Sequence, residues 1–193
     1  MVAQQVRVTG RMNSEDKLAR FEQSILPHMD AAYNLARWLS RNDFDAQDVV
    51  QEAYLRAFKF FAGLRSEDGR SWLLRIVRNT FYSWLEKNRR DEEKMTDEDA
   101  AEAVVSDTAA PDALLLKQMD SEALREAIQE LPVEFREALV MRELEGLSYK
   151  EMADIANLPL GTVMSRLARA RRQLRHVLTK RMAGKESDDL PRG

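Results

Sequence analysis

The chain has 193 residues, of which 44% are hydrophobic and 33% are charged, and its formal net charge is −3. This length accommodates one large domain or two small ones, each with a packed core. The chain contains no cysteine, which excludes disulfides, thiol redox sensing and zinc–thiolate sites. No apolar run approaches the roughly 20 residues that span a bilayer, and an apolar signal core is missing from the N-terminus. We therefore expect a cytoplasmic protein that does not insert into membranes.

Helical periodicity begins after a flexible tail of residues 1–13. The seven glycines, the five prolines and the lack of alternating β-branched runs favour an all-α fold, divided into two small helical domains. Residues 14–90 are the first predicted domain. Apolar residues recur at helical spacing from Ser14 to Trp38, where Pro27 either splits the run or sits in the first turn of a second helix.

The next predicted helix, from Ala46 to about Phe60, has one unusual outward position. Its outer face is polar, with Gln51 at the edge, and consists of Asp48, Glu52, Leu55, Arg56 and Lys59. Leu55 is the one apolar member of this face. A lone exposed leucine is common in soluble proteins. The alternative is that the face docks on a partner with Leu55 as its apolar anchor.

A polar loop, Gly63–Ser71, precedes a predicted helix from Trp72 to about Asn88. Arg75, Arg78, Asn79 and Tyr82 fall on its outward face, and Trp72 lies at the edge. Guanidinium groups, an aromatic ring and an amide together suit unpaired bases, because they bind phosphate, stack and hydrogen-bond respectively. The alternative is an ordinary solvated face.

Residues 91–112 read as a flexible acidic linker. Nine acids and a single base, Lys94, lie between Asp91 and Asp112, and large apolar residues do not recur periodically there. Residues 113–183 are the second predicted domain, which includes a helix from Val133 to Leu144, and residues 184–193 are a flexible tail. The basic C-terminal helix after an acidic linker is typical of nucleic-acid binding at one end of a chain.

The most informative stretch, Leu147–Arg175, predicts a helix-turn-helix. Ser148 and Glu151 have the spacing of a capping box at the start of a short helix, Tyr149–Ala156. Asn157 tolerates the left-handed conformation that ends a helix, and Pro159 prevents its continuation. A second helix then starts near Gly161–Thr162 and runs to about Arg175.

The second helix of this motif has two contrasting faces. One narrow stripe is apolar and must point inward: Val163, Leu167, Ala170 and Leu174. The opposite face is small or basic: Ser165, Ala168, Arg169 and Arg172, flanked by Met164, Arg166, Arg171 and Arg175. Seven Lys or Arg and no acid occur between Gly161 and Arg181. This charge pattern favours a helix that reads the DNA major groove over an ordinary helical hairpin.

We find no constellation that predicts an enzyme. His28 and His176 are far apart in sequence and lack ligand-spaced partners. No glycine-rich phosphate loop, metal cluster or paired acid–base set stands out. The sequence therefore predicts a non-enzymatic protein without a metal or another cofactor.

Three stretches resemble the sigma-70-type RNA polymerase factors of the extracytoplasmic-function (ECF) group, which keep only sigma regions two and four. They are DAQDVVQEAYLRAF, SWLLRIVRNTFYSWL and LPVEFREALVMRELEGLSYKEMADIANLPLGTVMSRLARARRQL. The resemblance covers roughly Ala19–Arg90 and Ser121–Leu178. It implies a transcription initiation factor that binds core RNA polymerase at its clamp and flap, recognises the minus-thirty-five and minus-ten promoter elements, and stabilises the melted non-template strand.

The resemblance also implies roles for particular residues. The polymerase-binding set is Asp48, Gln51, Glu52, Leu55 and Arg56. The minus-ten set is Trp72, Arg75, Arg78, Asn79 and Tyr82, and the Gly63–Ser71 loop would hold a flipped base. The minus-thirty-five set is Thr162, Met164, Ser165, Arg166, Ala168, Arg169 and Arg172. Met164 replaces the Arg or Lys of many relatives, and Ala168 is small where some relatives carry an aromatic residue, so the minus-thirty-five preference departs from theirs.

Partners and rival functions follow from the same comparison. The resemblance implies promoter DNA in duplex and single-stranded form, an anti-sigma factor, and a monomer when no partner is bound. The main alternative is a stand-alone helix-turn-helix regulator of duplex DNA, which usually binds as a dimer on paired half-sites. A decoy that binds a sigma partner is a third possibility, and the intact basic helix argues against it.

Overall fold

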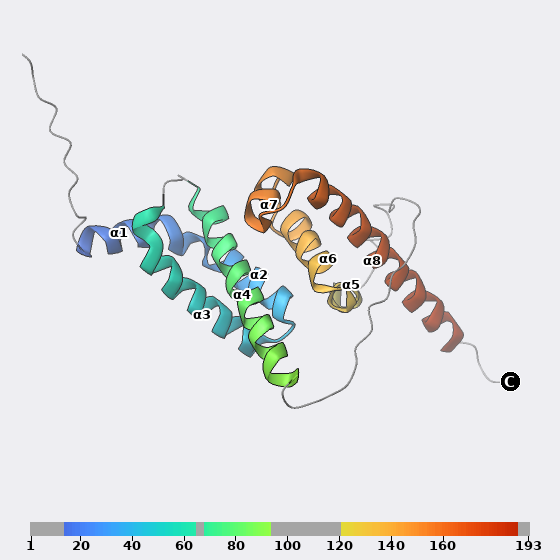
Figure 1. The fold of residues 1–193 in the computed structure, drawn as a ribbon. Helices are drawn as coiled ribbons and strands as arrows, with labels where there is room; N and C mark the ends of the chain where they lie inside the picture. The colour runs from blue at the N-terminus through green and yellow to red at the C-terminus, as the bar shows by residue number, and fades with distance from the viewer. Residues whose placement is uncertain (1–13, 65–67, 94–120, 189–193) are drawn as a thin grey trace, which may run out of the picture.

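The computed structural model describes residues 14–64, 68–93 and 121–188, and every secondary-structure element in these ranges is helical. The elements form two lobes, joined in sequence by residues 94–120 (Figure 1). The N-terminal lobe contains α1 (Ser14–Ile25), η1 (Leu26–His28), α2 (Met29–Ser40), α3 (Asp43–Phe60), η2 (Phe61–Gly63) and α4 (Gly69–Glu93). The C-terminal lobe contains α5 (Ser121–Glu130), α6 (Val133–Leu139), η4 (Val140–Leu144), α7 (Tyr149–Ala156) and α8 (Leu160–Asp188). The all-α prediction is confirmed for the part of the chain that the structure describes.

Local sequence signals explain the breaks in the N-terminal lobe. Pro27 lies in the short 3-10 turn η1, so it divides α1 from α2. Helix α2 ends where Arg41 adopts a left-handed conformation with φ of 62°. Asn42 then caps α3, because its side chain accepts a hydrogen bond from the backbone N–H of Phe44 at 2.8 Å.

The core of the N-terminal lobe is apolar and partly aromatic. Its largest fully buried side chains are Ile25, Leu35, Leu39, Leu73, Leu74 and Phe81. Phe21 meets the rings of Phe58 and Phe61 edge-on, with centroids 5.2 Å and 5.3 Å away. Phe58 nevertheless remains 39% exposed, because it covers the rim of this core rather than its centre.

Helix α4 begins earlier than the sequence pattern predicts. The loop was expected to run to Ser71, but Gly69, Arg70 and Ser71 already belong to the helix. Asp68 stabilises this start, since its carboxylate accepts a hydrogen bond from the Ser71 backbone N–H at 3.0 Å. Gly63 ends η2, Leu64 and Asp68 lie outside helices, and residues 65–67 of the predicted loop lie outside the described part of the chain.

The helix-turn-helix forms as its capping signals predict. The Ser148 side chain accepts from the Glu151 N–H, and the Glu151 carboxylate accepts from the Ser148 N–H, which completes the capping box. Asn157 ends α7 in a left-handed conformation with φ of 53°. Helix α8 starts at Leu160, directly after Pro159, and extends to Asp188, well beyond the predicted end near Arg175.

The predicted inward stripe of α8 is confirmed. Val163, Leu167, Ala170 and Leu174 are all buried. They pack with α6 and α7 around a second core, whose largest fully buried residues are Leu131, Met141, Leu147, Met152, Ile155 and Leu167. The predicted helix Val133–Leu144 is continuous but changes from α-helical to π-helical geometry at Val140.

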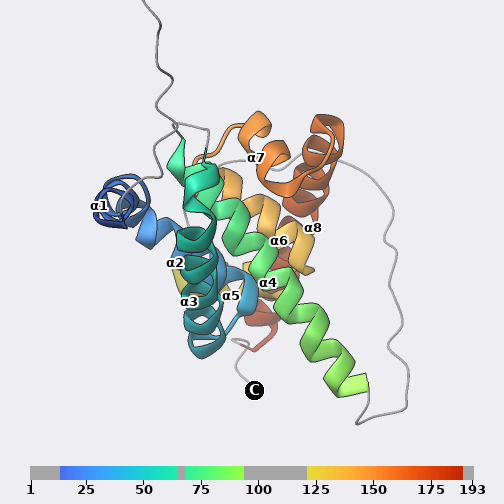
Figure 2. The ribbon, with the colours of Figure 1, turned by 60° about the vertical axis from the view of Figure 1, so that its left-hand side comes forward.

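The two lobes pack against each other. Helix α4 contacts α7, and α2 contacts α6 and η4, so this part of the C-terminal lobe faces the N-terminal lobe (Figure 2). The predicted linker, 91–112, lies almost entirely outside the described residues, as do both predicted tails apart from residues 184–188. Residues 113–120 of the predicted second domain are likewise outside them.

We predict that Gly69→Ala destabilises the N-terminal lobe by about 1–3 kcal/mol, the usual cost of overpacking a core. A Cβ at Gly69 would lie 2.3 Å from the backbone carbonyl oxygen of Ser24, so α1 and α4 would have to separate. Urea unfolding followed by circular dichroism measures the effect. Gly161→Ala is the matched control, because nothing lies within 4 Å of a Cβ there. Equal stabilities of the two variants would contradict this close approach.

Candidate polymerase and nucleic-acid interfaces

The outward face of α3 is open to solvent. Leu55 is 63% exposed, and Asp48, Gln51 and Glu52 around it are exposed as well. The Arg56 guanidinium donates to the Glu52 carboxylate at 2.7 Å, one helical turn away. An exposed leucine inside a charged face, with one neighbouring pair already neutralised, is a suitable apolar anchor for a protein partner.

The predicted base-binding face of α4 is divided. Arg75 and Asn79 are exposed, as predicted. Trp72 is half-buried and meets Phe61 edge-on, with centroids 6.4 Å apart. The prediction that Arg78 and Tyr82 face solvent is wrong for this arrangement of the lobes, because both side chains contact the C-terminal lobe.

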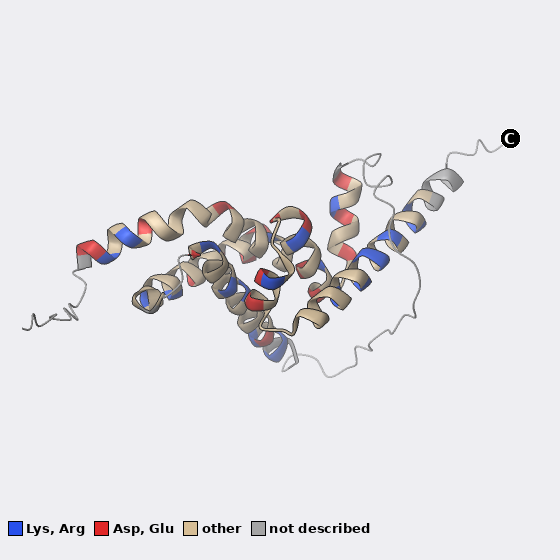
Figure 3. Cartoon of the chain, turned by 90° about the horizontal axis from the view of Figure 1, so that it is seen from above, with Lys and Arg blue, Asp and Glu red and all other residues tan. Residues whose placement is uncertain are grey.

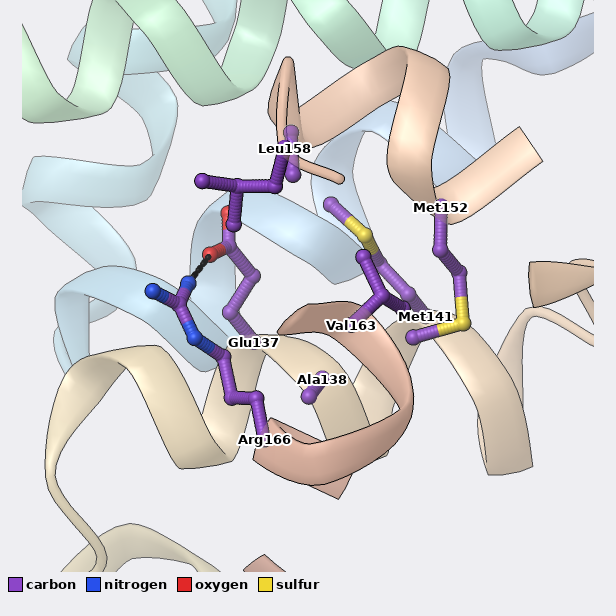
Figure 4. Close-up of a pocket in the computed structure, with 8 residues that line it drawn as sticks. Glu137, Ala138, Met141, Met152, Leu158, Val163 and Arg166 are labelled. Carbon is purple, nitrogen blue, oxygen red and sulfur yellow. Dashed lines mark ion pairs between the residues drawn. The ribbon is translucent and has the colours of Figure 1, made fainter. Parts of the chain in front are cut away.

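The contact between them is a cluster of charged and polar groups around Glu137 of α6, which we call the Glu137 cluster. Arg78 Nε donates to one Glu137 carboxylate oxygen at 2.5 Å, and Tyr82 Oη donates to the other at 3.1 Å. Arg166 of α8 lies 3.6 Å from the same carboxylate (Figure 4). The Arg78 guanidinium also lies over the Tyr82 ring, 4.6 Å from its centroid.

Burial sets the electrostatics of this cluster. The Glu137 side chain is 2% exposed, against 15% for Arg78 and 25% for Arg166. Burial raises the pKa of the Glu137 carboxyl, and the nearby Arg78 cation opposes that rise. Burial also raises the pKa of the Tyr82 hydroxyl, with a further contribution from Glu137. Tyr82 therefore stays protonated and acts as the hydrogen-bond donor.

The predicted DNA-reading face of α8 is only partly open. Met164, Ser165, Ala168 and Arg169 are exposed, and Thr162 and Arg172 are half-buried. Arg166, in contrast, turns toward Glu137. It lines a small hollow between α6, α7 and α8 whose other walls are mainly apolar, including Met141, Met152 and Leu158 (Figure 4).

Basic residues recur along α8 (Figure 3), and acids of the same lobe neutralise two of them. Arg171 donates to Glu143 of η4 at 2.5 Å. Arg181 pairs with both Glu126 and Glu130 of α5. These pairs direct two arginines of the basic helix toward the body of the lobe rather than toward a ligand.

Three further pairs of residues make contacts between the lobes. Arg136 donates to the backbone carbonyl of Leu39 at 2.8 Å, and Arg41 donates to that of Leu131 at 2.9 Å. Burial, with a smaller effect from Arg41, lowers the pKa of Arg136 to about 10, so it remains charged at neutral pH. Arg70 donates to both the backbone carbonyl and the carboxylate of Glu145, at 2.8 Å and 2.7 Å.

Sequence reasoning missed Arg136, Glu137 and Glu145 as functional candidates. All three lie in or directly after the predicted helix Val133–Leu144, and a helical sequence pattern does not distinguish a polar residue that faces water from one that faces the other lobe. In the fold, Glu137 lies among arginines that are 59 and 29 positions away from it in sequence. No local sequence pattern indicates that these residues meet.

Within the described ranges, no group of three or more potential metal ligands is present, and no helix is long and apolar enough to cross a membrane.

Comparison with known families identifies both lobes. The family model described as "Sigma-70 region 2" matches residues 25–91, and the one described as "Sigma-70, region 4" matches residues 121–174. The N-terminal lobe is thus similar to region 2 and the C-terminal lobe to region 4.

Curated relatives agree with these matches. The chain is 34% identical over 160 residues to the ECF RNA polymerase sigma factor SigE of Mycolicibacterium smegmatis, covering 83% of this chain and 62% of that protein. It is 31% identical over 182 residues to the RNA polymerase sigma-H factor of Pseudomonas aeruginosa, covering 91% and 94%. It is 36% identical over 135 residues to the ECF RNA polymerase sigma-E factor of Escherichia coli K12, covering 66% and 70%.

Solved structures show the same fold. The sigma factor RpoE from Bartonella quintana, determined in complex with the anti-sigma factor NepR, matches with a TM-score of 0.65 and 30% identity, covering 83% of this chain and 97% of that one. CnrH, determined with the cytosolic domain of CnrY, matches with a TM-score of 0.55 and 22% identity, covering 87% and 90%, which supports the fold alone. The two region matches, in this order, and the 36% identity to the Escherichia coli ECF factor, of which the chain covers 70%, lead to one conclusion: the chain belongs to the extracytoplasmic-function group of the sigma-70 family of RNA polymerase sigma factors.

Proposed function

We propose that this sigma factor divides promoter recognition between its two lobes while α3 holds it on core RNA polymerase. The observation that carries the proposal is the presence of three separate outward faces on one chain. They are an apolar-centred face on α3, the part of the base-friendly face of α4 that exposes Arg75 and Asn79, and a face at the start of α8 that exposes Arg169. A stand-alone regulator of duplex DNA would use only the last of these.

The α3 face binds the polymerase clamp in this proposal. Asp48, Gln51, Glu52 and Arg56 surround Leu55, which supplies the apolar anchor. Interfaces of this kind concentrate their binding energy in a few desolvated residues within a polar rim. The α3 face has this composition, and a second contact through the C-terminal lobe with the polymerase flap would complete the attachment.

The α4 face captures the minus-ten element. Arg75 and Arg78 bind the backbone, Asn79 hydrogen-bonds a base edge, and Trp72 and Tyr82 offer rings for stacking. Stacking contributes on the order of 1–3 kcal/mol per base, which offsets the few kcal/mol needed to extrude a base. Melting is then stabilised by capture of the unpaired strand, without an enzymatic activity in this chain. The loop before α4 would hold a flipped base.

The start of α8 reads the minus-thirty-five duplex. Ser165, Ala168 and Arg169 face solvent there, and Arg166 and Arg172 flank them. Exposed Met164 offers an apolar contact where many relatives offer a cation. The preferred sequence should therefore differ from theirs at the base pair that Met164 meets.

Membership of this family supports regulation by an anti-sigma factor. The similar structure of RpoE was likewise determined in complex with the anti-sigma factor NepR. Since this chain has no cysteine, any redox signal would have to be sensed by the partner. We place the protein in the cytoplasm, where core polymerase and promoter DNA are found.

Run-off transcription with purified core polymerase, on a library of promoter fragments, tests the proposed function. Transcripts that start only when this protein is present would establish promoter-specific initiation, and their upstream sequences would define both elements. If the protein binds duplex DNA tightly but never stimulates polymerase, the stand-alone regulator is the correct reading.

We predict that Leu55→Asp weakens binding to core polymerase by about tenfold or more, because a hot-spot residue contributes about 2 kcal/mol or more and a buried carboxylate adds a desolvation cost. Fluorescence anisotropy of the labelled protein, titrated with core polymerase, measures the loss. Leu18→Asp on α1 is the control, since Leu18 is also an exposed leucine of the same lobe. Equal affinities of the two variants would remove Leu55 from the interface.

We also predict that Arg169→Ala costs about 1–3 kcal/mol in affinity for the minus-thirty-five duplex and relaxes its sequence preference. The duplex should be taken from a promoter recovered by run-off transcription, and the affinity measured at one fixed salt concentration. Arg181→Ala removes the same charge from the same helix, but Arg181 pairs with α5 and should not reach DNA. A sequence preference that survives Arg169→Ala would assign the reading face elsewhere.

A further inference from the structure

The Glu137 cluster joins groups that the proposed function assigns to two different promoter elements. Arg78 and Tyr82 belong to the minus-ten face, and Arg166 belongs to the minus-thirty-five face. All three converge on one carboxylate, which presents two anionic oxygens to guanidinium groups much as a phosphate does. In this arrangement, those side chains cannot contact DNA phosphates or bases.

The polymerase face behaves differently in the same arrangement. Leu55 is 63% exposed, and the charged residues around it are not covered by the other lobe. The closed arrangement thus hides parts of both DNA-binding faces and leaves the α3 face accessible.

We propose that Glu137 is an internal latch: its carboxylate holds the two lobes together by pairing with the promoter-binding side chains Arg78 and Tyr82 of the other lobe, with Arg166 of its own lobe alongside, so that the free protein is closed to DNA but open to polymerase. The DNA part of this proposal rests on the proposed function, whereas the latch itself does not. Polymerase binding would come first, and separation of the lobes would then release Arg78 and Tyr82 of the minus-ten face.

The contacts of Glu137 favour the closed state only modestly, so that state can be reversed. A buried carboxylate loses its hydration, and ion pairs in a protein interior repay that loss only in part. The raised pKa of Glu137 reflects the same cost. When the lobes separate, Glu137 and Arg78 are hydrated again. The closed and open states therefore differ in free energy by less than the number of contacts implies. A partner that binds only the open state can therefore shift the population.

The groups around Glu137 determine what happens when its charge is removed. Arg78 and Arg166 approach it from α4 and α8 and are 15% and 25% exposed. Without the carboxylate, two largely buried cations would face each other. Removing one member of a buried ion pair is strongly destabilising for this reason. Only in the open state are both guanidinium groups separately hydrated.

Distances between the lobes provide the decisive measurement. Lys87 of α4 and Lys150 of α7 are exposed and lie outside all the proposed binding sets. The chain has no cysteine of its own, so Lys87→Cys with Lys150→Cys gives two unique sites for fluorophores or spin labels. We predict that the labelled full-length chain, with no partner present, shows mainly one short distance.

Adding Glu137→Gln should move this distribution to longer and broader distances, with the closed-to-open ratio falling by about tenfold or more. Glu143→Gln is the matched control. It removes the same charge from the same lobe, but Glu143 pairs with Arg171 within that lobe. A distance distribution for Glu137→Gln identical to that of the Glu143→Gln control would overturn the latch, and so would an original chain that is already mostly open.

A second variant distinguishes separation of the lobes from local unfolding of the C-terminal lobe. Glu145→Gln removes a second interlobe ion pair, with Arg70, without touching Arg166. It should open the protein in the same direction but less, because Arg70 still donates to the Glu145 backbone carbonyl. If Glu137→Gln lowers the helical circular dichroism signal, the distances measured for Glu145→Gln decide whether ion pairs hold the lobes together. Glu145→Gln distances unchanged from those of the original chain would reject this role for interlobe ion pairs.

Binding to a recovered promoter duplex tests the DNA part separately. Glu145→Gln should bind the duplex more tightly than Glu143→Gln does, by the factor by which it raises the open fraction. Glu137→Gln alone would not settle this, because it also frees Arg166 within its own lobe. If the distances shift but duplex affinity does not, the latch exists without guarding DNA. If run-off transcription fails while the distances shift, the proposed function falls and the latch remains.

Discussion

The burial of one carboxylate between two helical lobes governs how this chain is arranged. Glu137 is 2% exposed, and an isolated charge at that depth would be prohibitively costly. It is tolerated because donors arrive from both sides, Arg78 and Tyr82 from one lobe and Arg166 from its own. The position of α4 against α6 therefore depends on complementary charge as well as on apolar packing. When these ion pairs separate, the same side chains become available to bind another ligand.

Two other contacts between the lobes use the backbone rather than a countercharge. Arg136 and Arg41 donate to carbonyl groups of the opposite lobe, near the end of α2 and just before α6. Carbonyl groups near a helix C-terminus carry partial negative charge and lack intrahelical donors, so cations are favoured there. These reciprocal bonds fix the orientation of the lobes without depending on any residue assigned to promoter recognition. The interface between the lobes thus contains the Glu137 cluster, whose carboxylate would compete with DNA for the same side chains, and a set of hydrogen bonds that involves none of those side chains.

The sequence predicted the elements well wherever a local signal decides the structure. Pro27, Ser148 and Asn157 each act within one helical turn, and the breaks and caps occur where these residues require them. The inward stripe of α8 followed from spacing alone. The sequence could not predict which polar residues face the other lobe, because the interface joins residues that are 55 to 97 positions apart. Arg78 and Tyr82 were therefore assigned to solvent when they lie against Glu137, and the start of α4 was placed too late because Asp68 caps it from within the expected loop.

The chain between the lobes changes how strong their interface has to be. Residues 94–120 amount to 27 residues between the last described position of α4 and the start of α5. At about 3.3–3.6 Å per residue, a segment of that length reaches at most roughly 100 Å. Separated lobes therefore remain at a millimolar effective concentration with respect to each other, and closing is an intramolecular step. A contact too weak to hold two separate proteins together can keep this one closed, and an occupied open state closes again as soon as its partner leaves.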